Sequence, residues 1–292
     1  MRVENAPITF VTTCNNRSLL KQNLLESACV HVSRADQIII QEGFVSAALA
    51  YNDAIDRATT DVIVFAHQDV YFPDSWLADL DHALSRLADT DPHWGALGCY
   101  GIRQNGEGFG YLHSEGHGIL GKQFDSPIPI DTLDEFVLIL RKSSGLRFDA
   151  TLPHFHFYGT DICLAARKQG LRSYAISAFC VHNTQPYWSL PPEFYECYAH
   201  IKERYREYLP IRTPCIRVTK WNEEVYRRQL RSWYRRLFKK APVFRRLDDP
   251  RSIAAPEDSR QFSRPQTTSN LGAANGDAED RVASYESTHE RR

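Results

Sequence analysis

The chain has 292 residues, a formal net charge of −1 from 35 Lys and Arg against 36 Asp and Glu, and 42% hydrophobic residues. This ordinary globular composition excludes collagen-like, coiled-coil and wholly disordered chains. No run of about 18 apolar residues occurs, and the first seven residues carry both charge signs, so we expect neither a membrane-spanning helix nor a secretory signal. Seven scattered cysteines without a C-x-x-C pair predict reduced thiols and a cytoplasmic protein.

The first ninety residues alternate between apolar, β-branched runs and segments with helical spacing. Strands are predicted at 8–13, 37–41 and 62–66, and helices at 17–29, 46–58 and 75–88. This alternation is typical of an α/β fold in which a parallel sheet has helices on both faces. Ligands of such sheets bind at the carboxyl ends of the strands, so the polar residues that follow each strand are the first candidates for a site.

The middle of the chain adds two strands and a glycine-rich segment. Strands are predicted at 133–141 and 172–177. Residues 99–121 hold His113 and His117, which could share a zinc ion on a helix, but the five glycines from Gly101 to Gly116 favour a mobile loop.

Asp69 stands directly after the strand at 62–66, in the run His67-Gln68-Asp69-Val70. Its carboxylate should therefore project from the rim of the sheet. A carboxylate oxygen at this place suits Mg²⁺ or Mn²⁺ bridging a pyrophosphate. The alternative is a turn residue before Pro73.

Four motifs in order over residues 7–210 resemble the family-2-like glycosyltransferases of the GT-A type, and in particular the subgroup related to the StrF protein of streptomycin biosynthesis. The motifs are Ile8–Asn16, Tyr51-Asn52, His67-Gln68-Asp69-Val70, and Tyr158-Gly159-Thr160-Asp161 leading into Leu164, Arg167 and Gly170. The last one is similar to the family's Glu-Asp-x-x-Leu-x-x-Arg-x-x-Gly block, with Thr160 in place of the glutamate. The strand at 172–177 and then His182 follow at the expected place.

The resemblance implies a GT-A-like fold, with a mixed, mainly parallel sheet flanked by helices. It implies that Asp69 holds Mn²⁺ or Mg²⁺, that His182 is a further metal or phosphate ligand, and that Asp161 is the general base. The expected activity is an inverting transfer of a sugar from a UDP- or dTDP-sugar to a saccharide or lipid-linked acceptor.

The position of Asp161 in the sequence agrees with the role of a base. It lies in the first turn of a predicted helix, where the helix dipole favours the ionised carboxylate. An ionised carboxylate can accept the proton of an acceptor hydroxyl, an effect of about 10²–10⁴-fold on the rate. The alternative is that Asp161 only caps the helix.

Further residues are expected to contact the substrates. Candidates for the nucleotide-sugar are Thr12, Thr13, Asn15, Arg17, Glu42, Asn52, His67 and Gln68. His67 either ligates the metal or donates a hydrogen bond to phosphate, and Asn52 either braces a neighbouring loop or touches the donor. Asp134 and Tyr158 are candidates for contact with the acceptor. Alternatively, Asp134 is a solvated carboxylate in a turn, and Tyr158 belongs to a buried strand.

The charge is unevenly distributed. Residues 212–247 hold twelve Lys and Arg against two Glu, so the chain divides into a glycosyltransferase domain at 1–210, a basic helical extension at 211–248 and a disordered tail at 249–292. Apolar residues at helical spacing between Tyr226 and Phe238 predict a basic amphipathic helix. Its aromatic stripe either packs on the domain or lies, as a peripheral contact, on the anionic inner face of a membrane. No recognition motif for nucleic acid accompanies the charge.

Two other functions use the same features. A sugar nucleotidyltransferase would have a glycine-rich loop after its first strand, which Thr12 to Arg17 lack. A catalytically silent nucleotide-sugar or glycan-binding module would explain His67 and Thr160, which stand where the family carries carboxylates.

Overall fold

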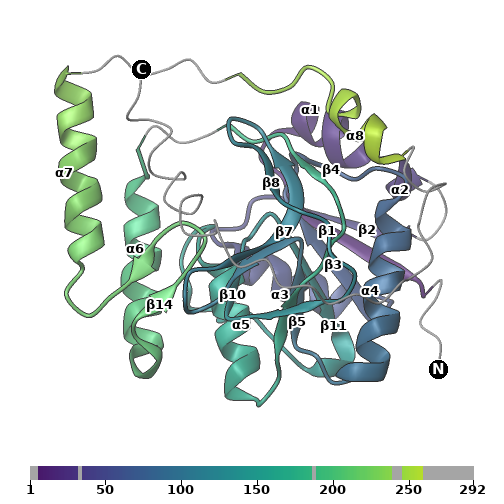
Figure 1. Ribbon diagram of the computed structural model, residues 1–292, viewed down its shortest axis with the longest axis horizontal. Helices are drawn as coiled ribbons and strands as arrows, with labels where there is room; N and C mark the ends of the chain where they lie inside the picture. The colour runs from purple at the N-terminus through teal and green to yellow at the C-terminus, as the bar shows by residue number, and fades with distance from the viewer. Residues whose placement is uncertain (1–5, 32–34, 186–188, 239–244, 259–292) are drawn as a thin grey trace, which may run out of the picture.

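The computed structural model describes residues 6–31, 35–185, 189–238 and 245–258. Its centre is a seven-stranded sheet in the order β2-β1-β3-β11-β5-β12-β9 (Figure 1). The strands are β1 (Ile8–Thr13), β2 (Ala35–Gln41), β3 (Val62–Ala66), β5 (Ala96–Gly98), β9 (Ile128–Ile130), β11 (Val137–Arg141) and β12 (Ser173–Ala175). β1 pairs in parallel with β2 and β3, and β5 with β12, whereas β11 and β9 are antiparallel to their neighbours. The predicted α/β class with a mixed sheet is confirmed.

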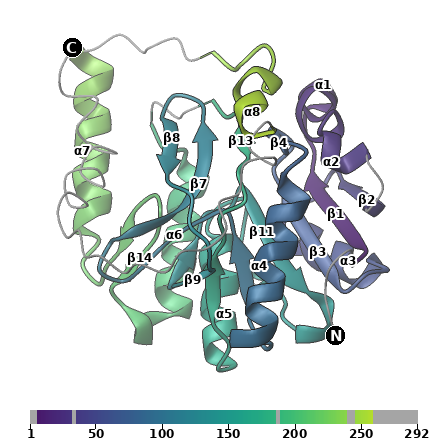
Figure 2. The same cartoon turned by 45° about the vertical axis from the view of Figure 1, so that its right-hand side comes forward.

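Helices cover both faces of this sheet (Figure 2). Their bounds are α1 (Arg17–Leu20), the π-helix η1 (Lys21–Leu25), α2 (Ala28–His31), α3 (Ala47–Arg57), α4 (Trp76–Thr90), the 3₁₀ helix η2 (Lys142–Ser144), α5 (Tyr158–Lys168), α6 (Pro192–Arg204) and the 3₁₀ helix η3 (Arg206–Tyr208). Side chains alternate between the faces along each strand. In β3, Ile63 and Phe65 pack towards α3, α5 and α6, and Val62 and Val64 pack towards α1 and α4.

A second sheet crosses the carboxyl ends of the central strands. Its order is β10-β6-β7-β13-β4, with β8 paired to β7. The bounds are β4 (Val70–Tyr71), β6 (Tyr100–Ile102), β7 (Gly108–Ser114), β8 (Gly118–Gly121), β10 (Thr132–Leu133) and β13 (Val181–His182). The glycine-rich segment is therefore a β-hairpin rather than the predicted loop, and it is not a helix. The predicted strand at 133–141 is interrupted, because the Asp134 carboxylate accepts the backbone N–H groups of Glu135 and Phe136 in a turn.

The C-terminal part forms a short hairpin and two helices. These are β14 (Ile211–Arg212), β15 (Arg217–Val218), α7 (Glu223–Phe238) and α8 (Arg251–Asp258). The prediction of a disordered tail is wrong for 251–258, since Ala254 of α8 is fully buried beside Tyr71 and Phe179. The rest of that tail, 259–292, lies outside the described residues.

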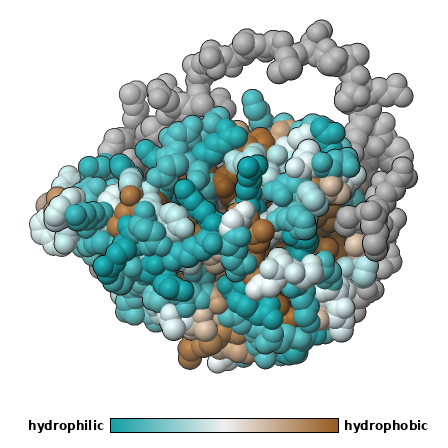
Figure 3. Space-filling model, turned by 90° about the horizontal axis from the view of Figure 1, so that it is seen from below, coloured by the Kyte–Doolittle hydropathy of each residue, from teal (hydrophilic) through white to brown (hydrophobic). Residues whose placement is uncertain are grey.

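Surface properties agree with this architecture. The face drawn in Figure 3 is largely hydrophilic, with smaller hydrophobic patches. Within the described ranges, none of the helices combines the length and the apolar character that crossing a membrane requires. All seven cysteines are free thiols, as predicted.

Candidate metal and substrate site

Strand pairing brings Asp69 and His182 together. β3 ends at Ala66, and the chain turns so that β4 pairs antiparallel with β13, opposing Val70 to His182. The Asp69 carbonyl accepts the backbone N–H of Asn183 at 2.8 Å, which fixes the turn against β13. The Asp69 carboxylate and the His182 ring therefore leave adjacent strands at the carboxyl end of the central sheet, where the topology predicts a ligand site.

His67 is held by a hydrogen bond that fixes its tautomer. Its Nε2 lies 2.6 Å from the Tyr158 hydroxyl, which itself donates to the carbonyl of Glu135 at 3.0 Å. When that hydroxyl donates to the Glu135 carbonyl, His67 donates from Nε2–H and its Nδ1 keeps a lone pair. Burial and the nearby His182 lower the pKa of His67 to about 4, so the ring is neutral at pH 7.

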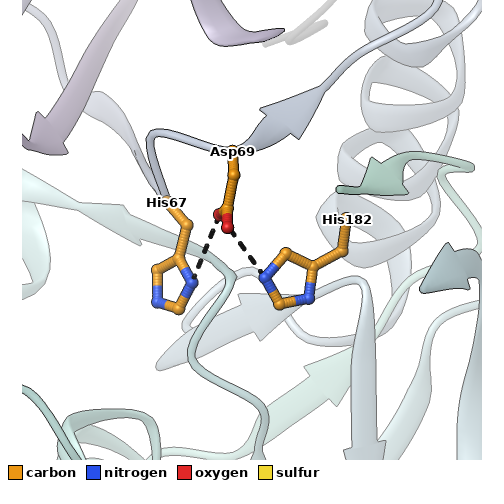
Figure 4. A group of neighbouring side chains, drawn as sticks. All are labelled: His67, Asp69 and His182. Atoms are coloured by element: carbon orange, nitrogen blue, oxygen red, sulfur yellow. Dashed lines mark ion pairs between the residues drawn. The ribbon is translucent and has the colours of Figure 1, made fainter. Parts of the chain in front are cut away.

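The three side chains form a compact cluster (Figure 4). His67 Nδ1 lies 3.9 Å and His182 Nε2 lies 3.5 Å from Asp69 Oδ1, and one ligand atom from each residue lies within 4.8 Å of the others. The His182 ring stacks on Phe136 at 5.1 Å. Its buried Nε2 has no hydrogen-bond partner among the described residues.

These features fit a divalent metal ion. An imidazole nitrogen from each of the two histidines and a carboxylate oxygen of Asp69 converge on one place, and a buried nitrogen without a hydrogen-bond partner is costly unless something binds it. Imidazole ligands are typical of Mn²⁺, Fe²⁺ or Zn²⁺ sites more than of Mg²⁺ sites. The cluster therefore has the donor set and the spacing to hold such an ion.

The charge of Asp69 is stabilised from two sides. Burial raises its pKa, but His182, His67 and Arg246 outweigh this effect and lower the pKa to about 2. Arg246 Nη2 lies 3.5 Å from Asp69 Oδ2, whereas the two histidines lie near the other carboxylate oxygen, Oδ1. Asp69 is therefore ionised over the whole physiological pH range.

The cluster opens into a cavity of about 1390 Å³, which is large enough for a nucleotide-sugar and an acceptor. The predicted site residues that line the cavity are Thr13, Asn15, His67, Gln68, Asp69, Asp134, Tyr158 and His182. Gln68 ties the loop after β1 to the loop after β3, since its Oε1 accepts the N–H groups of Asn15 and Asn16 and its Nε2 donates to Asn15 Oδ1.

Four predicted donor contacts do not line this cavity. Thr12 is fully buried, because β1 is a central strand and both faces of the sheet are covered there. Arg17 and Glu42 form an exposed ion pair with each other at 2.6 Å. Asn52 donates to the Phe148 carbonyl and accepts from the Phe148 N–H, so it braces the segment after β11, and the expected direct contact with the donor does not fit its position.

Asp161 is also outside the cavity. It is 0% exposed, its Oδ2 accepts the backbone N–H of Asp149 at 2.8 Å, and its Oδ1 accepts the Tyr205 hydroxyl at 2.6 Å. Burial raises its pKa. The role of a base, expected from the resemblance, does not fit this placement: Tyr158, one turn earlier on α5, faces the cavity, whereas Asp161 faces the core.

The aromatic run before α5 is mostly buried. Tyr158 is only 2% exposed and uses its hydroxyl to hold His67, so its place fits a positioning role better than the expected stacking on a sugar. Phe157 is equally buried, and Phe155, which is 40% exposed, is the member of the run that offers a ring to the cavity.

Sequence reasoning missed Glu135, whose partly exposed side chain lines the cavity beside Asp134. Burial and the charge of Asp134 raise the pKa of Glu135 well above its usual range, and burial also raises the pKa of Asp134. Gly159 makes this arrangement possible, since a Cβ there would lie 2.7 Å from the Leu133 carbonyl and 3.2 Å from Glu135 Cγ. The close approach of α5 to the segment 133–135 thus requires glycine.

Positive charges on the other wall were also missed. Arg228, Arg231 and Arg235 of α7 line the cavity, together with Arg246 from the segment before α8. The only sequence signal was the high local density of arginine.

Comparison with known proteins gives remote likenesses. No protein-family model matches the chain. It is 25% identical over 167 residues to "ATP synthase subunits region ORF 6" of Fuscovulum blasticum, which covers 56% of this chain and 66% of that protein.

Several solved structures show a remote likeness to the chain. GalNAc-T7, crystallised with UDP, GalNAc and Mn²⁺, matches 68% of this chain over 48% of its own length, with 10% identity and a TM-score of 0.46. The structure of S. aureus TarS residues 1–349 matches 68% of this chain and 64% of its own chain, with 13% identity and a TM-score of 0.43. The mannosyltransferase PcManGT of Pyrobaculum calidifontis was solved in complex with GDP-Man and Mn²⁺. It matches 98% of this chain and 81% of its own chain, with 12% identity and a TM-score of 0.42. The chain thus spans about half of GalNAc-T7.

Proposed function

We propose that this protein is a metal-dependent, inverting glycosyltransferase of the StrF-related type that transfers a sugar from a UDP- or dTDP-sugar to a saccharide or lipid-linked acceptor at the cytoplasmic face of a membrane. The observation that carries the proposal is the cluster of His67, Asp69 and His182 at the mouth of a large cavity at the carboxyl end of the sheet. The order of the sequence motifs supports the same activity.

In this proposal, His67, Asp69 and His182 hold Mn²⁺, and Mg²⁺ is the weaker alternative because two of the three ligands are imidazoles. The ion, when bound, stabilises the negative charge that builds up on the departing diphosphate. Thr13 and Asn15 lie on the side of the cavity formed by the end of β1 and contact the nucleoside. Arg246 lies beside Asp69 and offers its guanidinium to a phosphate.

We assign the general base to Glu135 in place of Asp161. A base works best when its pKa is near the working pH, and burial raises the pKa of Glu135 in that direction. Asp134 is less suited, because its Oδ1 accepts two backbone N–H groups, whereas the Glu135 carboxyl interacts with one, that of Phe157. In a single displacement, the acceptor oxygen bonds to the anomeric carbon, the bond from that carbon to the diphosphate breaks, and Glu135 receives the acceptor proton.

The binding half of the proposal is tested by thermal unfolding with UDP, dTDP or GDP, each with Mn²⁺, with Mg²⁺ or with EDTA. We expect UDP or dTDP to raise the melting temperature only when metal is present. Asp69→Asn and His182→Ala should abolish this rise, and His93→Ala, at an exposed position far from the cluster, should keep it. Absence of stabilisation by every diphosphate with either metal would overturn the proposal.

Turnover separates the proposal from its rivals. A transferase releases a nucleoside diphosphate from the donor, and NMR of the product should show inverted anomeric configuration. Glu135→Gln should lower kcat by about 10²–10⁴-fold while diphosphate binding is kept. Binding without any release of diphosphate would identify a silent binding module, and release of pyrophosphate from a nucleoside triphosphate would identify a nucleotidyltransferase.

A further inference from the structure

Helix α7 exposes a continuous apolar face. Six side chains on it are between 52% and 66% exposed: Tyr226, Leu230, Trp233, Tyr234, Leu237 and Phe238. They recur at intervals of three and four, so they form one stripe along the helix. Together with Trp221 they account for more than half of the large hydrophobic side chains exposed among the described residues. The expectation that this stripe packs on the domain is therefore wrong.

The opposite face of α7 is attached to the protein. Val225 is buried, Arg228 Nη2 donates to the Cys215 carbonyl at 2.6 Å, and Arg231 and Arg235 line the cavity. α7 stands at one edge of the described part of the molecule in both ribbon views (Figures 1 and 2). The orientation is thus set by the polar side chains, and the aromatic stripe points away from the protein.

Charge favours an anionic surface as the occupant of the stripe. Arg227 follows Tyr226 and lies on the same side of the helical wheel as the stripe, between Tyr234 and Phe238. The two acidic residues of α7 are engaged locally, since Glu223 accepts the Thr219 hydroxyl and Glu224 accepts the Arg217 N–H. The remaining charge along the helix is positive, so two copies packed stripe to stripe would bring arginines together.

The chemistry of the stripe points to a bilayer rather than to a protein groove. Tyr226, Trp233 and Tyr234 combine an apolar ring with a polar group, as side chains at the headgroup level of membranes do. A helix with such a face, flanked by arginines, partitions into the boundary between headgroups and acyl chains of anionic bilayers. We propose that α7 docks this protein onto an anionic lipid surface through the stripe from Tyr226 to Phe238.

Docking has a consequence for the cavity. α7 would lie flat on the bilayer with its aromatic face in the headgroup region, while Arg231 and Arg235 on its other side line the cavity. The cavity would then be one helix diameter, about 10 Å, from the headgroups. Docking does not depend on the proposed glycosyltransferase activity, but it would make a lipid-linked acceptor accessible to that site.

The test is co-sedimentation of the full chain with vesicles of phosphatidylcholine alone or mixed with phosphatidylglycerol. We expect binding to the anionic vesicles, weaker binding to the neutral ones, and a loss of affinity as salt increases. Leu230→Glu and Trp233→Glu should each weaken binding about tenfold or more, since each removes apolar contact and adds repulsion. Ile119→Glu, at a 55% exposed position on β8, is the matched control and should bind as the unchanged protein does.

Several outcomes would overturn the inference. These are absence of binding to anionic vesicles, equal binding by Leu230→Glu and the unchanged protein, and a dimer in sedimentation analysis that Leu230→Glu dissociates. Thermal unfolding of each variant shows whether it is folded, and exposed positions should tolerate the substitution. Diphosphate binding by Leu230→Glu should be unchanged, which keeps this test separate from that of the proposed function.

Discussion

Arg246 and Asp69, which lie far apart in the sequence, form an ion pair in which Nη2 of the arginine lies 3.5 Å from Oδ2 of the aspartate. The pair depends on Asn183, directly after β13. Its carbonyl accepts Arg246 Nε, and its side chain exchanges two hydrogen bonds with the backbone of Leu247. The segment before α8 is thereby fastened to the same strand that carries His182. The C-terminal part of the chain thus adds a positive charge to the candidate metal site.

Arg246→Gln should have opposite effects on two ligands. Removing a positive charge beside Asp69 should strengthen binding of Mn²⁺ alone, whereas a nucleoside diphosphate, which loses a cationic partner, should bind more weakly. The Arg246 side chain is partly exposed to water, so each effect should be about two- to fivefold. Titration calorimetry with Mn²⁺, and then with UDP at saturating Mn²⁺, measures both. Arg251→Gln, which removes an exposed pair with Asp249, is the control, and a parallel fall in both affinities would contradict the prediction.

Tyr158→Phe should weaken metal binding without removing a ligand. The lost hydroxyl accepts the Nε2–H of His67, so the ring would no longer be fixed with its Nδ1 lone pair towards Asp69. Loss of the hydrogen-bond partner of a metal ligand typically lowers the metal affinity about 10- to 100-fold, and we expect a loss of this size for Mn²⁺. Tyr174→Phe removes a comparable hydroxyl, bonded to Asp91, far from the cluster. Equal Mn²⁺ affinities in the two variants would contradict a positioning role for Tyr158.

Asp161→Asn should act on stability rather than on catalysis. Both carboxylate oxygens accept hydrogen bonds, from Asp149 and Tyr205, and an amide would face one of these donors with its own N–H₂ group. Leaving a buried donor unsatisfied costs about 1–3 kcal/mol in the free energy of unfolding. At a temperature where the variant is folded, kcat should fall less than about tenfold, far less than in Glu135→Gln. A large loss of kcat at an unchanged melting temperature would restore Asp161 as the base.

Asp149 should make the stability of the protein sensitive to acid. Burial raises its pKa, but hydrogen bonds from Thr151 and His200 outweigh this and lower the pKa to about 2, with Arg204 Nε also 3.0 Å away. The carboxylate titrates near 3.9 in an unfolded chain. Because the folded pKa is the lower one, its contribution is complete above about pH 4 and is lost as the pH falls towards 2.

Urea unfolding of the unchanged protein and of Asp149→Asn measures this contribution. At pH 7 the variant should be less stable by about 1.5–3 kcal/mol, the value of hydrogen bonds to a charged group. The difference should shrink between pH 4 and pH 2. Asp56→Asn, at an exposed pair with Arg147, should change little at any pH. A difference that stays constant with pH would show that folding does not lower the pKa of Asp149.

Local patterns predicted much of the fold. The apolar, β-branched runs of β1 and β3 gave their bounds as the structure has them, and the parallel pairing of β1 with its two neighbours follows from the intervening helices. The polar residues after β3 were predictable as a site, because ligands of such sheets bind at the carboxyl ends of the strands. The bounds of the glycine-rich hairpin were not, because β7 pairs not only with the adjacent β8 but also with β13, a strand that is distant in the sequence.

Sequence motifs did not predict which way a side chain points from its helix. Tyr158 and Asp161 belong to one motif and lie one turn apart, yet the first reaches His67 and the second is enclosed by Tyr205 of a later segment. Likewise, α7 was predicted as amphipathic, and only its attachment through Arg228 shows which face is outside.

Composition and periodicity alone determined that the chain forms an α/β sheet and that Asp69 follows a buried strand, because these depend on neighbours within a few residues. Tertiary structure decided that His182 and Arg246 join Asp69, that Glu135 reaches the cavity and that Asp161 does not. Those relationships arise from pairing and packing between segments far apart in the chain, whose register no local pattern encodes.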